Sequence, residues 1–199
     1  MIRLPDTAHT ARPWRIHEIA PDFELEDVWE LPGRGGPDDF PRLVDMIVSF
    51  DLSRSPSRAT RALWSLRWTV GRLLGWDDAD GGLDARVSTL YDRLPADLVR
   101  GGRGPDFPQL PFRSLYLTDS EFAAEIANAT MHGVMHIGAV EEGPDSFRAQ
   151  MAVLVKPNGR LGSAYMAAIR PFRRLVVYPA MMRQGRELWE RGPAANPGG

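Results

Sequence analysis

Two of the four histidines in the chain, His132 and His136, lie four residues apart in the stretch TMHGVMHIGAV (residues 130–140). Imidazole changes its charge near neutral pH, so this pair suits acid–base chemistry or metal binding. A zinc-protease helix carries two histidines at this spacing, but it also needs a glutamate directly after the first one. Gly133 stands there instead, and the flanking residues alternate between apolar and small or polar types. The pattern therefore predicts a strand.

On a strand the two imidazoles share one face, roughly 13–14 Å apart at ~3.3–3.4 Å per residue. That separation is too large for two ligands of one metal ion, which bind at roughly 2.0–2.1 Å, so no metal site is expected. Two interpretations stay open for His132 and His136. Each is either a hydrogen-bonded residue of a sheet or an acid–base group that faces a cavity. His9, near the N-terminus, and His17, on an expected strand, are given no role.

The elements around the histidines alternate with a period of two. A second strand is expected at residues 146–156, after the turn sequence GPD, which makes an antiparallel hairpin. RSLYLT (residues 113–118) also reads as a strand, whereas EFAAEIAN (residues 121–128) fits either a strand or a helix. In the second hairpin strand one face is apolar, formed by Phe147, Ala149, Met151, Val153 and Val155.

The rest of the chain is expected to be mainly helical. Residues 12–19 read as a short strand and residues 21–31 as a short helix. Helices are then indicated by apolar residues at helical spacing: Leu43, Ile47 and Phe50, and later Leu63, Leu66, Val70 and Leu73. Residues 76–111 are rich in Gly, Pro and Asp and predict a long loop. A long helical segment with prolines at Pro171 and Pro179 follows the hairpin.

This order of elements predicts an α+β fold, with helices packed against an antiparallel sheet. A chain of 199 residues fits a single domain, assigned here to residues 5–190, and the tail at residues 191–199 is expected to be disordered. The net charge of −2 gives no electrostatic footprint for nucleic acid or an anionic membrane. No apolar run approaches the ~20 residues of a membrane helix. A cytoplasmic protein is expected, because the N-terminus lacks an apolar signal core.

Several kinds of chemistry are excluded by residue type. The chain has no cysteine, which removes disulfides, thiolate catalysis and cysteine-based metal sites. The glycine-rich stretches GRGG and GGRG lack the spacing of a dinucleotide or phosphate loop. We therefore expect no cofactor.

One block of the sequence, VLVKPNGRLGSAYMAAIRPFRRLVVYPAMMRQ (residues 153–184), resembles a bacterial family known only as domain-of-unknown-function family 2867. The likeness extends to PWRIHEIAPDFELEDVW and NATMHGVMHIG and spans most of residues 5–190. The resemblance implies a helix-grip-like fold, as in START and polyketide-cyclase domains. In that fold a curved antiparallel sheet wraps a long C-terminal helix over an apolar cavity. Some relatives carry the domain behind a nucleotide-binding dehydrogenase domain.

Three functions are compatible with these observations. The first is binding of a small apolar or aromatic, polyketide-like molecule between the sheet and the last helix. The candidate ligand-binding residues are Glu125, Met135, Met151, Tyr165, Met166 and Arg170. The second is a cofactor-free cyclase, dehydratase or isomerase, in which His132 or His136 moves a proton and Tyr165 or Arg170 stabilises an oxyanion. The third is a partner subunit of a dehydrogenase, and a homodimer is also left open.

Overall fold

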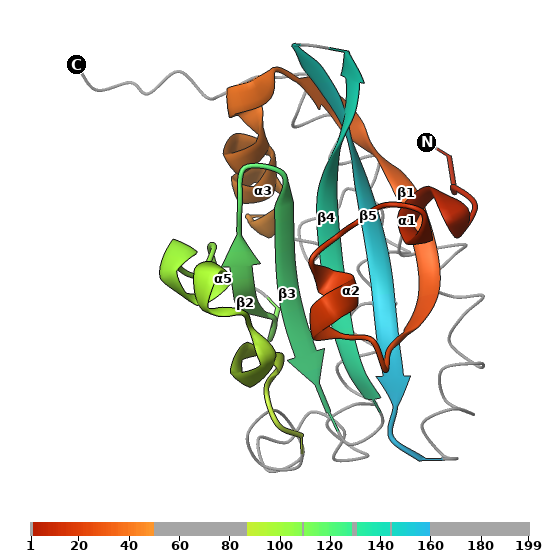
Figure 1. Cartoon of the computed structure of the whole chain (residues 1–199), viewed down its shortest axis with the longest axis vertical. Helices are drawn as coiled ribbons and strands as arrows, with labels where there is room; N and C mark the ends of the chain where they lie inside the picture. The colour runs from red at the N-terminus through yellow and green to blue at the C-terminus, as the bar shows by residue number, and fades with distance from the viewer. Residues whose placement is uncertain (1, 50–86, 109, 129–130, 144, 160–199) are drawn as a thin grey trace, which may run out of the picture.

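The computed structural model describes residues 2–49, 87–108, 110–128, 131–143 and 145–159. These residues form an α+β fold around one curved antiparallel sheet, whose strand order is β1-β5-β4-β3-β2 (Figure 1). The strands are β1 (Glu24–Gly35), β2 (Arg113–Leu117), β3 (Glu121–Ala127), β4 (Met131–Gly143) and β5 (Ser146–Pro157). The helices are α1 (Thr7–Thr10), α2 (Ile16–Ile19), α3 (Phe40–Val48) and α5 (Ala96–Gly101), with 3-10 turns η1 (Pro37–Asp39) and η4 (Leu90–Arg93).

The strands β2 to β5 form an antiparallel meander, in which each strand pairs with the next one along the chain. The predicted hairpin is confirmed, because β4 pairs with β5 from Met131↔Pro157 to Gly143↔Ser146. Residues 121–127, which fitted a strand or a helix, are the strand β3. The strand at RSLYLT and the helix around Leu43 and Ile47 are also confirmed, as β2 and α3.

Two predictions for the N-terminal part are wrong. Residues 12–19 are not a strand, because they contain the short helix α2, which buries Ile16 and Ile19. His17 consequently lies on α2. Residues 21–31 are not a helix, because they enter β1, which pairs antiparallel with β5. Its register shifts between Leu25 and Asp27, and this irregularity interrupts the period-two pattern that identifies a strand.

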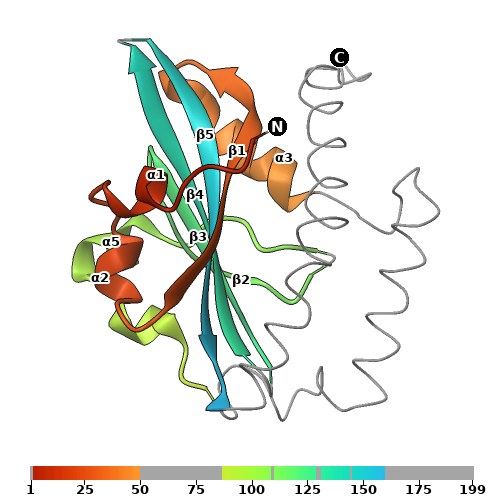
Figure 2. The same cartoon turned by 90° about the vertical axis from the view of Figure 1, so that its right-hand side faces the viewer.

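The two faces of the sheet are covered by different parts of the chain, as Figure 2 shows. Residues 2–23, which we call the N-terminal strap, carry α1 and α2 and cover one face together with η4 and α5. We call this the N-terminal face. The opposite face packs against α3 and is called the α3 face. Along β4 the residues alternate, so that Val134 joins the core of the N-terminal face and Met135 joins that of the α3 face.

Some sequence predictions lie wholly or partly outside the described residues. They include the helix at residues 55–75, the C-terminal helical segment and the tail at residues 191–199. The predicted loop at residues 76–111 is described from residue 87 onward, where it contains η4 and α5. None of the described helices is long and apolar enough to cross a membrane.

Candidate functional site

Two buried glutamate–histidine pairs lie side by side on the N-terminal face. Glu121 and Glu125 are four residues apart on β3, and His136 and His132 are four residues apart on the antiparallel strand β4. Each glutamate bonds diagonally to one histidine, His136 Nε2 to Glu121 Oε2 at 3.1 Å and His132 Nε2 to Glu125 Oε2 at 2.8 Å. Residues at diagonal positions on paired strands point to the same face and are close enough for long side chains to meet.

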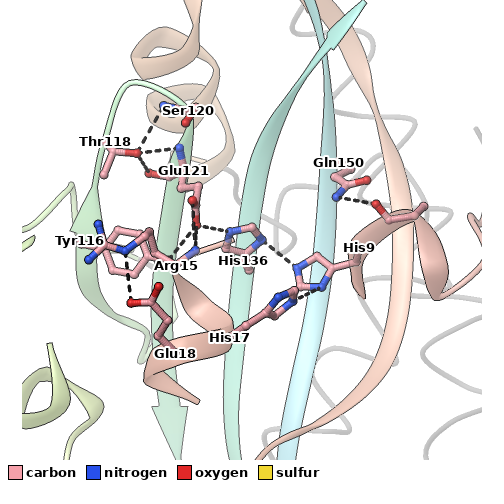
Figure 3. A network of polar contacts seen from close by, with 11 residues as sticks. His9, Arg15, His17, Glu18, Tyr116, Thr118, Ser120, Glu121, His136 and Gln150 are labelled. Carbon is pink, nitrogen blue, oxygen red and sulfur yellow. Dashed lines mark hydrogen bonds and ion pairs between the residues drawn. The ribbon is translucent and has the colours of Figure 1, made fainter. Parts of the chain in front are cut away.

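The first pair is the inner end of a longer chain of imidazoles, shown in Figure 3. His136 Nδ1 lies 3.1 Å from His9 Nε2, and His9 Nδ1 lies 3.1 Å from His17 Nε2. Both distances are within hydrogen-bonding range. His136 and His9 are fully buried, and His17 is half-buried. Three hydrogen bonds therefore lead from the partly exposed α2, through α1, to a buried carboxylate on β3.

The carboxylate fixes the direction of these hydrogen bonds. An ionised glutamate only accepts, so His136 donates from Nε2 to Glu121. A neutral imidazole has one N–H, and His136 Nδ1 must then accept from His9 Nε2. By the same rule His9 Nδ1 accepts from His17 Nε2. With neutral imidazoles, every hydrogen bond in the chain is satisfied and all of them point toward the carboxylate.

Glu121 is held ionised by donors on several sides. The backbone N–H of Arg15 donates to Oε1 and Oε2 at 3.2 and 3.0 Å, and the Tyr116 hydroxyl donates to Oε2 at 3.1 Å. Burial acts to raise the pKa of Glu121, but the hydrogen bonds from His136, Arg15 and Tyr116 outweigh it and leave the pKa below its usual value. Burial raises the pKa of Tyr116 well above its usual value, so this residue stays a donor.

Burial has the opposite effect on the histidines, because it disfavours their charged form. The pKa of His9 is lowered to about 3, by burial first and then by the neighbouring His136 and His17. Burial also lowers the pKa of His136, although Glu121 acts in the other direction. Both imidazoles are therefore neutral at pH 7.

A bulge in β2 and a glycine in β4 make room for this arrangement. The β2–β3 register shifts between Ser114 and Tyr116, which places Tyr116 opposite Ala123 on the N-terminal face. On β4, a Cβ atom at Gly138 would lie 2.8 Å from the ring of Trp14, so only glycine lets this indole lie against the strand. The Trp14 ring lies beside His136, with ring centroids 5.3 Å apart, and covers this side of the imidazole chain.

The second pair has different neighbours. Glu125 accepts hydrogen bonds from the Thr89 hydroxyl and, at 2.9 Å, from the backbone N–H of Leu90 at the start of η4. The ring of Phe23 contacts the edge of His132, with centroids 4.9 Å apart. This pair ties the segment at residues 87–93 to the sheet and has no imidazole partner beyond His132 among the described residues.

The imidazole chain is linear, and its nitrogens do not converge on one point, since His9 uses one nitrogen for each neighbour. Among the described residues, no group of three or more His, Asp or Glu side chains is arranged to hold a metal ion. The chemistry that the arrangement offers is proton binding and transfer along hydrogen bonds.

The candidate residues from the sequence fall into three groups. His132, His136 and Glu125 lie together on the N-terminal face and are buried. Met135 and Met151 lie on the α3 face, in the other core. Tyr165, Met166 and Arg170 lie outside the described residues. Since alternate residues of a strand face opposite ways, the histidines and the two methionines do not line one common cavity.

Sequence reasoning missed His9, His17, Glu121 and Tyr116. One signal was available for Glu121. Two glutamates four apart, followed after a short turn by two histidines four apart, place each carboxylate beside an imidazole if the segments pair as antiparallel strands. No comparable pattern connects His9 and His17 to β4, because that contact joins residues 127 positions apart.

The comparisons with known proteins give one match. The model of a family described as "Protein of unknown function (DUF2867)" matches residues 19–180, a span that contains all five strands. Glu121 and His136 lie inside the matched region, whereas His9 and His17 precede it. No curated protein and no solved structure matches the chain significantly.

Proposed function

The chain belongs to the DUF2867 family of proteins of unknown function, and for this member we propose binding of a small apolar or aromatic, polyketide-like molecule on the α3 face of the sheet. The observation that carries the proposal is the separation of side-chain types between the two faces. The α3 face gathers thioether and aromatic side chains, and the buried His–Glu pairs are on the other face. Ligand pockets in proteins are mostly apolar, with few polar groups.

Two methionines give the proposed binding surface its adaptability. Met135 pairs with Val153 and Met151 pairs with Ile137, so the two thioethers come from neighbouring strands at diagonal positions. Met151 is 1% exposed and Met135 7%, and both belong to the core beside α3. Methionine side chains are flexible and polarisable, and they fill irregular space against an apolar ligand.

Aromatic rings border the same surface. The ring of Phe107 lies 5.3 Å from that of Phe112 and 6.3 Å from that of Phe122, measured between centroids. Phe112 is only partly buried, as are Leu110 and Leu117, which pack against the same core. Offset and tilted aromatic contacts at such distances favour a flat, unsaturated ligand over a flexible aliphatic one.

The finer fold assignment belongs to the same proposal. A curved antiparallel sheet is common to helix-grip domains and to this chain, and it supports this assignment. Tyr165, Met166 and Arg170 lie outside the described residues and enter the proposal from the sequence alone. Their types, one apolar and two with polar groups, are those that a mostly apolar ligand site uses.

The geometry favours binding over histidine catalysis. An acid–base residue must come within hydrogen-bond reach of the proton that it moves. His132 and His136 lie on the N-terminal face, where His132 is covered by Phe23 and His136 by Trp14. A ligand on the α3 face is separated from both imidazoles by the sheet itself.

Native mass spectrometry of the purified protein, before and after denaturation, tests the proposal. We expect an organic adduct that leaves on unfolding and that then serves as the probe for variants. Met135→Ala and Met151→Ala each remove apolar contact worth about 1–2 kcal/mol, which corresponds to roughly 5–30-fold weaker binding.

Leu154→Ala is the matched control. Leu154 is buried on the same strand as Met151 but belongs to the core of the N-terminal face. It should lower stability by a similar amount and leave the affinity unchanged. The absence of any adduct, together with no binding of the apolar dye 1-anilinonaphthalene-8-sulfonate to the folded protein, would falsify the proposal, and equal weakening by Leu154→Ala would contradict the assigned face.

A further inference from the structure

The imidazole chain joins two parts of the molecule that are far apart in sequence. His9 and His17 belong to the N-terminal strap, and His136 belongs to β4 in the middle of the sheet. The bond between His9 and His136 is buried (Figure 3). Beside it, the Gln150 side chain of β5 donates to the Ala8 carbonyl at 3.4 Å. The imidazoles thus form a buried polar contact between the strap and the centre of the sheet, beside the hydrogen bonds from Arg15 to Glu121 and the apolar packing of the strap.

This junction disfavours a second proton on its two fully buried imidazoles, His9 and His136. A second proton on His9 turns Nδ1 from an acceptor into a donor, and its bond to His17 is kept only if His17 moves its own proton from Nε2 to Nδ1. A second proton on His136 likewise requires His9 and His17 to change tautomer, although its charge is offset by Glu121. A charge on His9 lies fully buried between two imidazoles, with no carboxylate bonded to it, and a buried unpaired charge is strongly unfavourable.

One rearrangement would let the chain take up a proton without losing its hydrogen bonds. A proton entering at His17 Nδ1 would move each N–H proton one step inward and end on Glu121. The carboxyl would then donate to His136 Nε2. This state is disfavoured, because the Arg15 N–H and the Tyr116 hydroxyl stabilise Glu121 as an ionised acceptor. Added protons therefore accumulate on the imidazoles themselves.

We propose that His17, His9 and His136 form an acid-sensitive latch, which holds the N-terminal strap on the sheet at neutral pH and releases it at mildly acidic pH. The inference concerns the face opposite the proposed ligand site, so it does not depend on ligand binding. Release uncovers an apolar surface on both partners, since Trp14 and Ile16 of the strap pack against Ala152 and other residues of the sheet.

The direction of the pH effect follows from proton linkage. Release exposes His9, whose pKa is then ordinary and near 6.5, whereas burial lowers the pKa of latched His9 to about 3 and also lowers the pKa of His136 on β4. The released state binds more protons below about pH 6.5, and the latched state loses stability as the pH falls through this value. Above it the latch is at full strength.

Several other ionisable groups pack against the latch. Arg15 faces Asp97 of α5 at 2.7 Å and Glu18 at 3.5 Å, and the pKa of Asp97 is lowered by that arginine. On β3 and β2 the latch faces Glu121 and Tyr116, whose pKa values are lowered and raised, away from neutrality. From β5 it faces Gln150, which carries no charge. The lowered pKa values of Asp97 and Glu121 and the raised pKa of Tyr116 keep these three groups in one protonation state between pH 7.5 and 5.0, so the buried imidazoles are the pH-sensitive part of the latch.

Hydrogen–deuterium exchange of the full chain, followed by mass spectrometry at pH 7.5, 6.5, 5.5 and 5.0, measures release directly. The exchange rates, corrected for their intrinsic pH dependence, give the ratio of latched to released strap. A histidine that stays neutral in the latched state and has an ordinary pKa in the released state lowers this ratio about 30-fold between pH 7.5 and 5.0. His9 therefore accounts for a loss of about 30-fold, and His136 acts in the same direction, since burial lowers its pKa as well. We expect this loss in peptides from residues 2–20, while peptides from β4 and β5 stay protected.

His9→Gln and His132→Gln make a matched pair of variants. Glutamine can donate and accept but does not titrate, so His9→Gln should remove the roughly 30-fold share of the pH-dependent loss that His9 contributes. His132 is equally buried on the same face of β4 and bonded to a glutamate, but it lies outside the latch. His132→Gln should keep the pH dependence of the unmodified protein.

Nuclear magnetic resonance of the four imidazoles in the unmodified protein gives a second measurement that needs no variant. We expect the signals of His9 and His136 to change together, at the pH at which strap protection is lost. Protection of the strap that stays within about threefold of its neutral value at pH 5.0 overturns the proposal. So does protection lost only in parallel with β4 and β5, because that is acid unfolding of the whole domain.

Discussion

The two faces of one sheet are built on different principles. The α3 face is a hydrocarbon core in which Phe122, Ile137 and Met151 are almost completely buried. The N-terminal face has an apolar core of similar kind, but two His–Glu pairs run through it. Apolar contact is largely independent of pH and tolerant of exact geometry, whereas buried polar pairs depend on both. The same strands thus present one face suited to an adaptable apolar contact. Their other face is suited to a contact that depends on pH and on exact geometry.

The largest effect should come from removing a large side chain from the core of the α3 face. Phe122→Ala removes a fully buried ring and should lower the free energy of unfolding by about 3–5 kcal/mol. Because no charge is involved, the loss should be the same at pH 7.5 and pH 5.5. Urea denaturation at the two pH values measures both. A loss that changed by more than about 1 kcal/mol between them would remove the distinction between the faces.

A smaller effect is expected from Glu121→Gln on the N-terminal face. The amide keeps the volume but has one acceptor oxygen where the carboxylate has two, and its NH2 group meets donors from His136, Tyr116 and Arg15. One unpaired buried donor costs about 1–3 kcal/mol. Urea denaturation measures the loss of stability, and hydrogen exchange should show faster opening of the strap.

Glu125→Gln is the control for this prediction. It disturbs an equivalent pair on the same strand, but its partners are Thr89, Leu90 and His132, which lie outside the strap. It should loosen residues 87–93 in preference to residues 2–20. Equal loosening of the strap by both variants would mean that the two pairs are coupled, and that the latch is not a separate unit.

The smallest effect should come from the exposed rim of the strap, where Asp22 pairs with Lys156 of β5. The Lys156 ammonium lies 2.7 Å from Asp22, and both side chains are well exposed. Exposed ion pairs contribute about 0–1 kcal/mol, so Lys156→Gln should change stability by less than about 1 kcal/mol, and the difference should vanish in 0.5 M salt. Thermal unfolding at low and high salt is the measurement. A larger, salt-independent loss would show that the strap is held at its rim and not at its centre.

The parts of the fold that could be predicted are those governed by local pattern. The β4–β5 hairpin has regular alternation and a short turn, and its register runs almost without interruption. The strand β1 was missed because its register shifts twice and because its pairing with β5 joins residues such as Glu24 and Val155, which are distant in sequence. Residues 12–19 were misread because Trp and Ile favour strands, although Ile16 and Ile19 have the spacing of one helical face.

The candidate site divides in the same way. The sequence predicted that His132 and His136 share one face of a strand, and both belong to the N-terminal face. It gave no role to His9, which lies near the end of the chain and yet is completely buried. His9 is buried because the strap packs against the sheet. That packing joins segments that are distant in sequence, and local periodicity carries no information about it.

The strand order has a consequence for the assembly of the protein. β2 to β5 pair with their neighbours in sequence, whereas β1 pairs with β5, the last of the described strands along the chain. The strap can bond to β1 through Ile2 and Leu4, but β1 has no neighbour in the sheet until β5 has been made, more than a hundred residues later. Contacts between distant residues form slowly, because a long loop must close first. Among the described residues, the strap and β1 therefore join the sheet late, and until then the meander presents its β5 edge and part of its N-terminal face to chaperones and to other chains.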